Sequence, residues 1–307
     1  MPDMRATSIV VAAAAVAGMV QAGQETTQVA WHYGMPDTGL LPSYGRFEWF
    51  TRMGERHGGN SELSMQSYGI SVPFLDPRKT GWGETMVNLQ FDAKVTILNT
   101  GGSLDLANEE MYNFALPITF ITPMPNGRRW TYGLAPEVAS DSDAAEKGFD
   151  LAAYAFYTVK QSEHFTYSLG LAASPRFAEY GVLPMMRFEW TPNDRWTVSL
   201  AGYQLQALYH ATDRLSFGPF LASRGGIWSV GTERGDRIFR VRSLVAGAMF
   251  EYDFSRPGQT KRIITAAVGS TLTTNAQFLE RNGRKDAYDN HHYKPALYIS
   301  AGVDFRF

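Results

Sequence analysis

The chain of 307 residues contains no cysteine. The absence of thiols excludes a disulfide scaffold, a thiolate metal site and a cysteine nucleophile. It suits a chain that folds outside the cytoplasm without disulfides. An excess of charge of one sign is also missing, because 28 basic and 30 acidic residues give a formal net charge of −2. The basic surplus typical of nucleic-acid-binding proteins is therefore lacking, and no nucleic-acid partner is expected.

Long apolar runs are scarce, and the clearest one lies near the N-terminus. After Arg5, the uncharged core Ser8–Val20 has thirteen residues. A membrane-spanning helix needs about 20. Val20-Gln21-Ala22 fits a small-residue cleavage site, so we expect residues 1–22 to be a secretory signal peptide and residues 23–307 to be the mature domain. The alternative is an apolar buried helix.

Most of the mature chain alternates between apolar and polar residues. The clearest segment is Glu84–Leu98, and Phe149–Val159, His164–Ala173 and Ala296–Phe307 follow the same rule. Side chains alternate between the two faces of a strand, whereas helical spacing is almost absent beyond the signal peptide. The pattern predicts an all-β protein.

The final strand needs cover on one face and partners on both edges. Its apolar face runs to the terminal Phe307, and such an edge exposed in water would promote aggregation. In hydrocarbon every backbone polar group must be paired, so a sheet there must close on itself. We therefore predict a closed antiparallel up-and-down transmembrane β-barrel with both termini in the periplasm. Its length favours about twelve strands, within a range of about ten to fourteen.

Turn lengths and tryptophans agree with a membrane barrel. Short connections such as Pro192–Arg195 alternate with long polar ones such as Ala276–Tyr293, as expected for periplasmic turns and outer loops. Trp190 and Trp196 flank the Pro192–Arg195 turn, which predicts an aromatic girdle at the membrane interface. The alternative is a pair of core tryptophans in a soluble secreted β-sandwich. The terminal phenylalanine and the long strands argue against the sandwich.

The end of the chain resembles a known signature. Phe307 preceded by Phe305, Val303, Ala301 and Ile299 is similar to the C-terminal strand of bacterial outer-membrane barrels. The resemblance implies that this strand, with Phe305 and Phe307 as its signal, is recognised by the barrel-assembly machinery. It also implies an outer-membrane location, with outer-membrane lipid as the surrounding partner.

A second resemblance covers Val182–Gly231, about a sixth of the chain. This segment looks like an uncharacterised Gram-negative outer-membrane β-barrel family that is known only as a domain of unknown function. The resemblance implies the barrel fold and no particular activity. The residues that carry it are Pro184, Arg187, Trp190, Pro192, Asn193, Trp196, Tyr209, Asp213, Arg214 and Trp228.

Polar side chains of both signs fall on the inward faces of the predicted strands. They predict either a porin-like passage for small solutes or cross-barrel ion pairs that make a closed structural or surface-interaction barrel rigid. A change of apolar parity in Arg237–Phe254, and another in Leu63–Val72, indicates a bulge or an extension beyond the apolar zone. The inward candidates are Arg46, Glu48, Arg52, Asn88, Gln90, Asp92, Lys94, Arg187, Glu189, Arg240, Arg242, Asp304 and Arg306.

An outer-membrane hydrolase is a further alternative. It needs a nucleophile held against a base, such as a Ser–His pair, and the chain has no G-x-S-x-G elbow. His164 and His210 are the histidines whose replacement would test it. His291 and His292 could bind a metal with nearby aspartates Asp286 and Asp289, but adjacent histidines in a strand point apart. We expect no catalytic residue, no metal and no cofactor.

Overall fold

The computed structural model describes residues 43–56, 61–80, 83–101, 104–174, 181–232, 235–256, 261–279 and 285–306. Within these ranges the chain forms β-strands and one 3-10 turn, Ala145–Lys147. The expected signal peptide, residues 1–22, and the terminal Phe307 lie outside the described residues.

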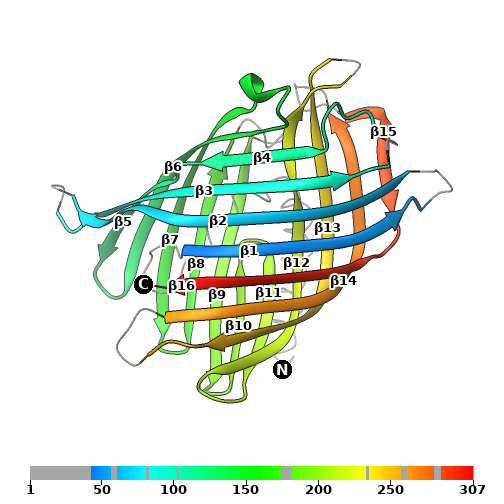
Figure 1. Cartoon of the computed structure of the whole chain (residues 1–307). Helices are drawn as coiled ribbons and strands as arrows, with labels where there is room; N and C mark the ends of the chain where they lie inside the picture. Colours follow the sequence, from blue (N-terminus) through cyan, green and yellow to red (C-terminus); the bar gives the residue numbers. More distant parts are fainter. Residues whose placement is uncertain are drawn as a thin grey trace, which may run out of the picture.

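The strands appear in Figure 1 in chain order. Their bounds are β1 Ser43–Gly54, β2 Glu62–Lys79, β3 Met86–Asn99, β4 Glu110–Ala115, β5 Ile118–Met124, β6 Arg128–Ser140, β7 Phe149–Ser162, β8 Phe165–Ala173, β9 Val182–Asn193, β10 Trp196–Ala201, β11 Gln204–His210, β12 Leu215–Val230, β13 Arg237–Asp253, β14 Lys261–Leu279, β15 Lys285–Tyr293 and β16 Leu297–Arg306.

Antiparallel pairing between neighbouring strands closes the sheet into a ring. β1 pairs with β16, β16 with β14, and β14 with β13, which completes the circuit through β12 back to β2. β4 and β5 both lie between β3 and β6, and β15 continues the line of β16 along β14. Counted as wall positions, the ring has fourteen strands. The predicted closed barrel is confirmed, and the expected number of about twelve was too low by two.

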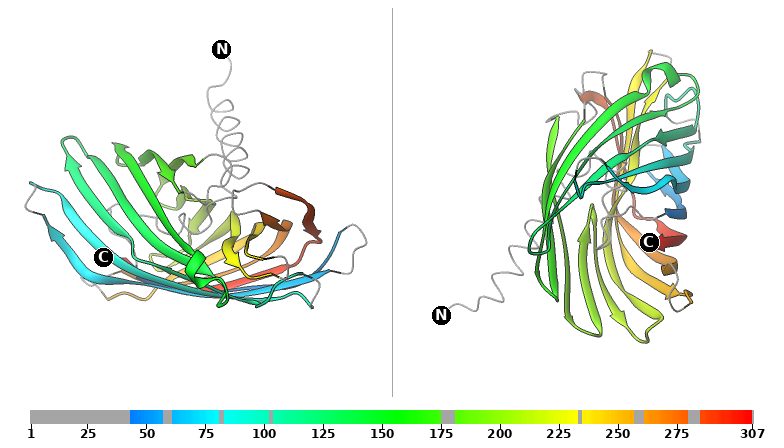
Figure 2. Two further views of the ribbon diagram at one scale, coloured as in Figure 1. Left: turned by 90° about the horizontal axis from the view of Figure 1, so that it is seen from above. Right: turned by 90° about the vertical axis from the view of Figure 1, so that its left-hand side faces the viewer.

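The ring is strongly tilted and curved. In Figure 1, β1–β3 and β16 cross the view almost at right angles to β7–β12 behind them, as expected when the strands of a barrel are tilted. The view from above in Figure 2 shows the wall strands curving round the interior. Ser43 of β1 lies opposite Phe305 of β16, so the first and last described strands meet at one end of the barrel.

The two ends of the barrel differ in their connections. At the end where β1 begins, called here the turn end, the connections 125–127, 163–164, 194–195 and 211–214 are short. At the opposite end, called the loop end, the connections 100–109 and 141–148 are longer. These connections follow the expected pattern of periplasmic turns and outer loops. The long connection expected at Ala276–Tyr293 was wrong, because β14 runs to Leu279 and β15 spans Lys285–Tyr293, so most of that segment is strand.

The outer surface is apolar because most of the wall strands expose large apolar side chains on their outward face. On β8, Leu169 and Leu171 are 54% and 55% exposed, while Ser168 before them and Ala172 after them are buried. β16 behaves as its sequence predicts, with Leu297 and Phe305 exposed and Tyr298 and Asp304 buried. A soluble protein would bury such side chains, so the outer surface requires an apolar environment.

An aromatic belt follows the outer surface near the turn end. Trp190 and Trp196 are both exposed. Trp196 packs on Tyr209 with ring centroids 5.3 Å apart, and Tyr209 packs on Phe217 at 5.8 Å. Phe217 in turn lies 6.3 Å from Phe250 on β13. The rings thus form a continuous row across β10, β11, β12 and β13.

Two strands of the wall are much shorter than their neighbours. β10 and β11 have 6 and 7 residues, whereas β12 has 16. Their hairpin turns back at Gly202 and Tyr203, so beyond Ala222 the edge of β12 has no partner in β11. At β10 and β11 the wall therefore stops short of the loop end, and this place is called here the low point.

Above the low point, β12 bends into the barrel. Gly225 has φ of 137°, a conformation that residues with a Cβ atom rarely adopt, and a Cβ there would lie 2.0 Å from the Val241 carbonyl oxygen. Beyond this bend Ser229 forms a parallel bridge with Ser140 of β6, on the far side of the low point. The loop end of the barrel is thereby narrowed.

Candidate functional site

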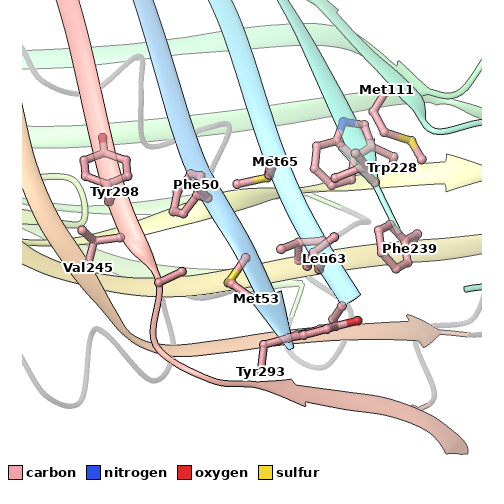
Figure 3. Close-up of a cluster of buried hydrophobic side chains, with 14 of the residues drawn as sticks. Phe50, Met53, Leu63, Met65, Met111, Trp228, Phe239, Val245, Tyr293 and Tyr298 are labelled. Atoms are coloured by element: carbon pink, nitrogen blue, oxygen red, sulfur yellow. The ribbon is translucent and has the colours of Figure 1, made fainter. Parts of the chain in front are cut away.

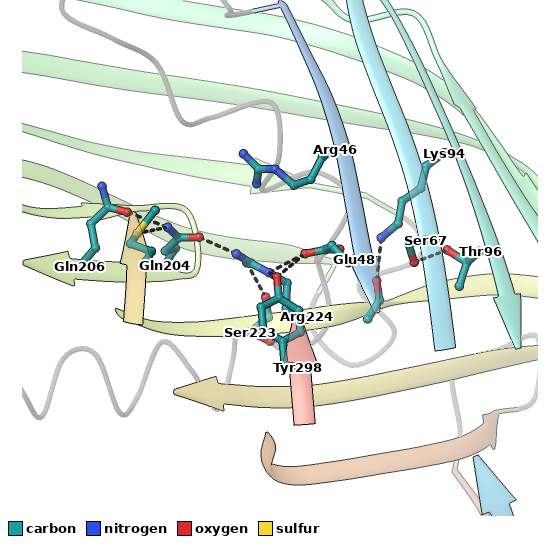
Figure 4. Close-up of polar contacts among 12 residues, drawn as sticks. Arg46, Glu48, Ser67, Lys94, Thr96, Gln204, Gln206, Ser223, Arg224 and Tyr298 are labelled. Carbon is teal, nitrogen blue, oxygen red and sulfur yellow. Dashed lines mark hydrogen bonds and ion pairs between the residues drawn. The ribbon is translucent and has the colours of Figure 1, made fainter. Parts of the chain in front are cut away.

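A cross-barrel ion pair lies in the interior at the bend of β12. Arg224 Nε lies 2.9 Å from Glu48 Oε1 on β1. The hydroxyl of Tyr298 on β16 donates to the same carboxylate oxygen at 2.8 Å, and Arg224 Nη2 donates to Gln204 Oε1 at 2.5 Å. Figure 4 shows these side chains converging from four strands. Both charges are nearly inaccessible and hydrogen-bonded, which is the condition under which buried charges are tolerated.

Further charges continue this polar zone towards the turn end. Arg46 Nη2 lies 3.6 Å from Asp304 Oδ1, and Lys94 Nζ donates to the Gly225 carbonyl at 3.4 Å. A cavity is lined by the charged residues Arg46, Glu48, Asp92, Lys94 and Glu137, together with Tyr44 and smaller residues of β2, β3 and β4. Charged groups of either sign in this lining can form hydrogen bonds with water or with a small polar solute.

The loop end of the interior is filled by apolar side chains, called here the apolar core cluster. Phe50, Met65, Trp228, Phe239 and Tyr298 are among its members, and all are at most 1% exposed. Figure 3 shows them packed between β1, β2 and the inward-bent ends of β12 and β13. The cluster closes a large part of the loop end to water.

Trp228 fixes this cluster to the opposite wall. Its indole Nε1–H donates to Asn113 Oδ1 on β4 at 2.8 Å, and its ring lies 6.4 Å from that of Phe239. The neighbouring Gly226 leaves room for the indole, because a Cβ there would lie 2.2 Å from the ring.

Hydrogen bonds outside the wall hold the bent strand in place. Asp141, next to the end of β6, accepts the backbone N–H groups of Gly231 and Ala144, each at 2.9 Å. Burial raises the pKa of the Asp141 carboxyl, and these two N–H groups oppose the rise. Lys147 and Asp236 form an ion pair between the same two connections. The tip of β12 and β13 is therefore attached to the connection between β6 and β7.

A second set of contacts joins β15 to the end of β1. Ser61 Oγ donates to Glu55 at 2.5 Å, and His291 Nδ1 lies 3.2 Å from the same carboxylate. The hydrogen bond from Ser61 lowers the pKa of Glu55 against the opposing effect of burial. His291 is thus engaged with Glu55 in a polar contact at the rim.

Most of the inward candidates lie on the interior face. The placement follows the alternation that predicted it, and whether these groups line a solute path stays a proposal. Glu48, Asn88, Gln90, Asp92 and Asp304 are buried, Arg46 and Lys94 are partly buried beside them, and Arg187 and Glu189 lie on the inner parity of β9. The Arg306 side chain lies outside the described part of the chain.

Arg52 differs from its expected position. The register of β1 against β2 shifts between Phe50 and Met53, so both of these residues enter the apolar core cluster. Arg52 lies within the shift, its side chain is 70% exposed, and it pairs with Glu62. The two-residue alternation that predicted an inward arginine is interrupted by this bulge.

Arg240 and Arg242 also lie on the other face from the one expected. β13 pairs with β12 without a register shift, and its inward residues Phe239 and Val241 belong to the apolar core cluster. The two arginines alternate with them, and Arg240, which is 1% exposed, lies opposite Gln277 of β14. At the parity change the register of β13 against β14 does shift, between Leu244 and Val245, and the extra residue, Leu272, lies on β14. The apolar residues pass from the outer surface to the interior cluster.

Arg224 is a site residue that sequence reasoning missed. It shares its face with Phe220 and Ala222, both buried in the interior, so alternation alone could have placed it inward. The two glycines that follow it, Gly225 and Gly226, interrupt the pattern and conceal the continuation of the strand.

The histidines supply no complete hydrolytic arrangement among the described residues. His210 Nδ1 lies 2.7 Å from Ser216 Oγ, a pair that only the fold brings together, but its Nε2 faces Thr197 Oγ1 at 2.8 Å, where a triad needs a carboxylate. His164 is exposed at a turn. No metal-binding group of three or more His, Asp or Glu side chains occurs in the part of the chain that is described. In that same part, none of the helical structure is long and apolar enough to cross a membrane.

Comparison with protein families gives one decisive match. The family model described as "Domain of unknown function (DUF6268)" covers residues 47–306, which is nearly the whole barrel. The chain belongs to this family. The DUF6268 match extends far beyond the segment Val182–Gly231 that carries the sequence resemblance, and it includes β2 to β16 complete. No curated protein matches the chain.

The DUF6268 barrel is also similar to solved barrel structures. A KdgM porin aligns over 86% of this chain and 99% of its own, with 8% identity and a TM-score of 0.34. A Pseudomonas aeruginosa FadL homologue aligns over 92% and 94%, with 10% identity and a TM-score of 0.38. A mutant of the Rh. blastica porin aligns over 87% and 100%, with 13% identity and a TM-score of 0.27. At these values the similarities assign no function to the DUF6268 chain.

Proposed function

We propose that this protein is an outer-membrane barrel through which small polar solutes pass at a restricted rate. The observation that carries the proposal is the charged interior of a closed ring, with Arg46, Glu48, Asp92 and Lys94 around one cavity. The outward apolar surface and the aromatic belt with Trp190 and Trp196 support a position in a bilayer with the turn end in the periplasm. The ion pair of Arg224 and Glu48 narrows the path.

The route to the membrane is part of the same proposal. Residues 1–22 act as a signal peptide, and cleavage leaves a mature chain that begins at Gly23. The last strand, with Phe305 and Phe307, serves as the signal for the barrel-assembly machinery. In support, β16 pairs along its length with β1 and β14, so its insertion completes the ring.

A closed barrel that works only through its loop end is the second candidate. The observation that favours it is the apolar core cluster, because side chains such as Trp228 and Phe239 leave little room for water. Solute passage and closure make opposite predictions for current across a bilayer.

Recording in planar bilayers with the purified chain distinguishes the two candidates. We expect stepwise currents far smaller than those of a wide, water-filled porin, because the polar path is narrowed by Arg224. Lys94→Gln should shift the reversal potential in a salt gradient towards cation selectivity, since it removes a positive charge from the cavity. Lys79→Gln, at an exposed ion pair with Glu84, is the matched control and should leave selectivity unchanged.

Insertion is verified by a gel on which the unheated SDS sample still runs as the folded band. Zero current from protein that passes this control would refute passage and support the closed barrel. A selectivity shift of equal size in both lysine variants would show that the cavity does not control the path.

A further inference from the structure

A row of polar side chains crosses the inner face of four neighbouring strands near the turn end. Arg129 of β6 lies opposite Thr158 of β7, Thr158 opposite Ser168 of β8, and Ser168 opposite Arg187 of β9. The two hydroxyls lie 2.8 Å apart. The four residues line one cavity that is separate from the cavity around Glu48. These strands stand side by side in Figure 1.

The spacing of this row suits a single anionic group. Three strand intervals separate the Arg129 and Arg187 backbones, which is about 14 Å, and two arginine side chains can converge across it. A guanidinium presents a planar set of donors that matches carboxylate and phosphate oxygens. The hydroxyls of Thr158 and Ser168 lie between the arginines and offer further donors.

The surrounding charges keep this region positive. The next inward row towards the turn end contains Lys160, Thr166 and Glu189 as direct partners. Two arginines and one lysine therefore face one carboxylate within the two rows. An anion that approaches from the turn end meets a favourable potential.

An apolar surface begins immediately beyond the arginines. The next row towards the loop end holds Phe156 and Met185, which also line the cavity, and the row after it holds Tyr154 and Leu183. These residues form a buried apolar cluster with Tyr203 of the short hairpin between β10 and β11. The cavity itself reaches Gly202 of that hairpin. Its wall is thus cationic at one end and apolar at the other.

We propose that this cavity binds an amphipathic anion with a single alkyl chain. The carboxylate or phosphate head lies between Arg129 and Arg187, with hydrogen bonds from Thr158 and Ser168, and the chain extends along Phe156 and Met185. A small polar solute would contact only the arginines, and an uncharged lipid would contact only the apolar residues. An amphipathic anion contacts both. Equilibrium binding does not require transport, so this inference stands or falls separately from the conductance result.

Titration calorimetry of the folded chain in nanodiscs, with empty nanodiscs subtracted, tests the site with octanoate as the probe. Octyl phosphate is the second probe, and it carries the same chain with a phosphate head in place of the carboxylate. Acetate carries the head without the chain, and octyltrimethylammonium carries the chain with the opposite charge. We expect both octyl anions to bind and both comparison compounds to bind at least about tenfold more weakly, because each lacks half of the interactions.

Variants locate the site. Arg129→Gln with Arg187→Gln should weaken octanoate binding at least about tenfold, since charged hydrogen bonds are lost. Arg128→Gln changes an exposed arginine next along the same strand and is the matched control, with unchanged affinity expected. Folding of each variant is checked by band shift on heating in SDS. Octanoate binding that is undiminished in the folded double variant, or equal binding of acetate, would overturn the proposal.

Discussion

Replacing Trp228 by alanine is expected to lower the free energy of unfolding by about 4 kcal/mol, the usual range for removal of a fully buried aromatic side chain. The indole is 0% exposed and belongs to the apolar core cluster. Its loss also leaves Asn113 without the donor of a 2.8 Å hydrogen bond. Urea titration of the chain folded into phospholipid vesicles measures the change.

Conductance gives this variant a second readout. The apolar core cluster fills the loop end, so a cavity at Trp228 should admit water and raise the single-channel current. Trp196→Ala removes a tryptophan from the outer surface and serves as the control, with a smaller loss of stability and no change in current. If the Trp228 variant unfolds at the wild-type urea concentration, then the cluster does not hold the loop end together.

Replacing Arg224 by alanine is expected to destabilise the barrel by about 3 kcal/mol, because Glu48 then remains as a buried charge without its cation. Glu48→Ala should cost a similar amount, because Arg224 would then remain as a buried cation without its carboxylate. The double variant, with both Arg224 and Glu48 replaced by alanine, should recover part of this loss, because neither charge of the pair is left without the other. Unfolding in urea, analysed as a double-mutant cycle, measures the coupling.

The pair also controls the width of the proposed path. Breaking it should release β12 from β1 and increase the current, while the exposed pair of Arg52 and Glu62 provides a control whose rupture should change little. A coupling energy near zero between Arg224 and Glu48 would contradict the idea that this contact fixes the bent strand.

The wall of the barrel was predictable where each strand meets lipid on one face and the interior on the other. β3 and β16 follow their alternation to within a residue or two, because burial and exposure alternate along the whole strand. The number of strands was underestimated because a uniform length per strand was assumed. The hairpin of β10 and β11 is far shorter, at 6 and 7 residues with a two-residue turn.

The interior was only partly predictable from the sequence. Glu48, Asp92 and Asp304 follow from alternation, since polar residues between outward apolar ones face the lumen. Arg240 was misplaced, because near the loop end the apolar face of β13 turns inward and the usual inference is reversed. The pairing of Arg224 with Glu48 depends on a bend at Gly225 and on strands far apart in the chain, which no local pattern reveals.

Single-cysteine spin labelling on β8 tests the central claim most directly, and the cysteine-free sequence makes it straightforward. Labels replace Ser168, Leu169, Leu171 and Ala172 in turn, in chains folded into lipid vesicles. The closed barrel predicts that labels at Leu169 and Leu171 are relaxed by oxygen dissolved in the bilayer, and that labels at Ser168 and Ala172 are not. The opposite phase, or equal access of a water-soluble nickel chelate to all four positions, would contradict a membrane barrel with its apolar face outward.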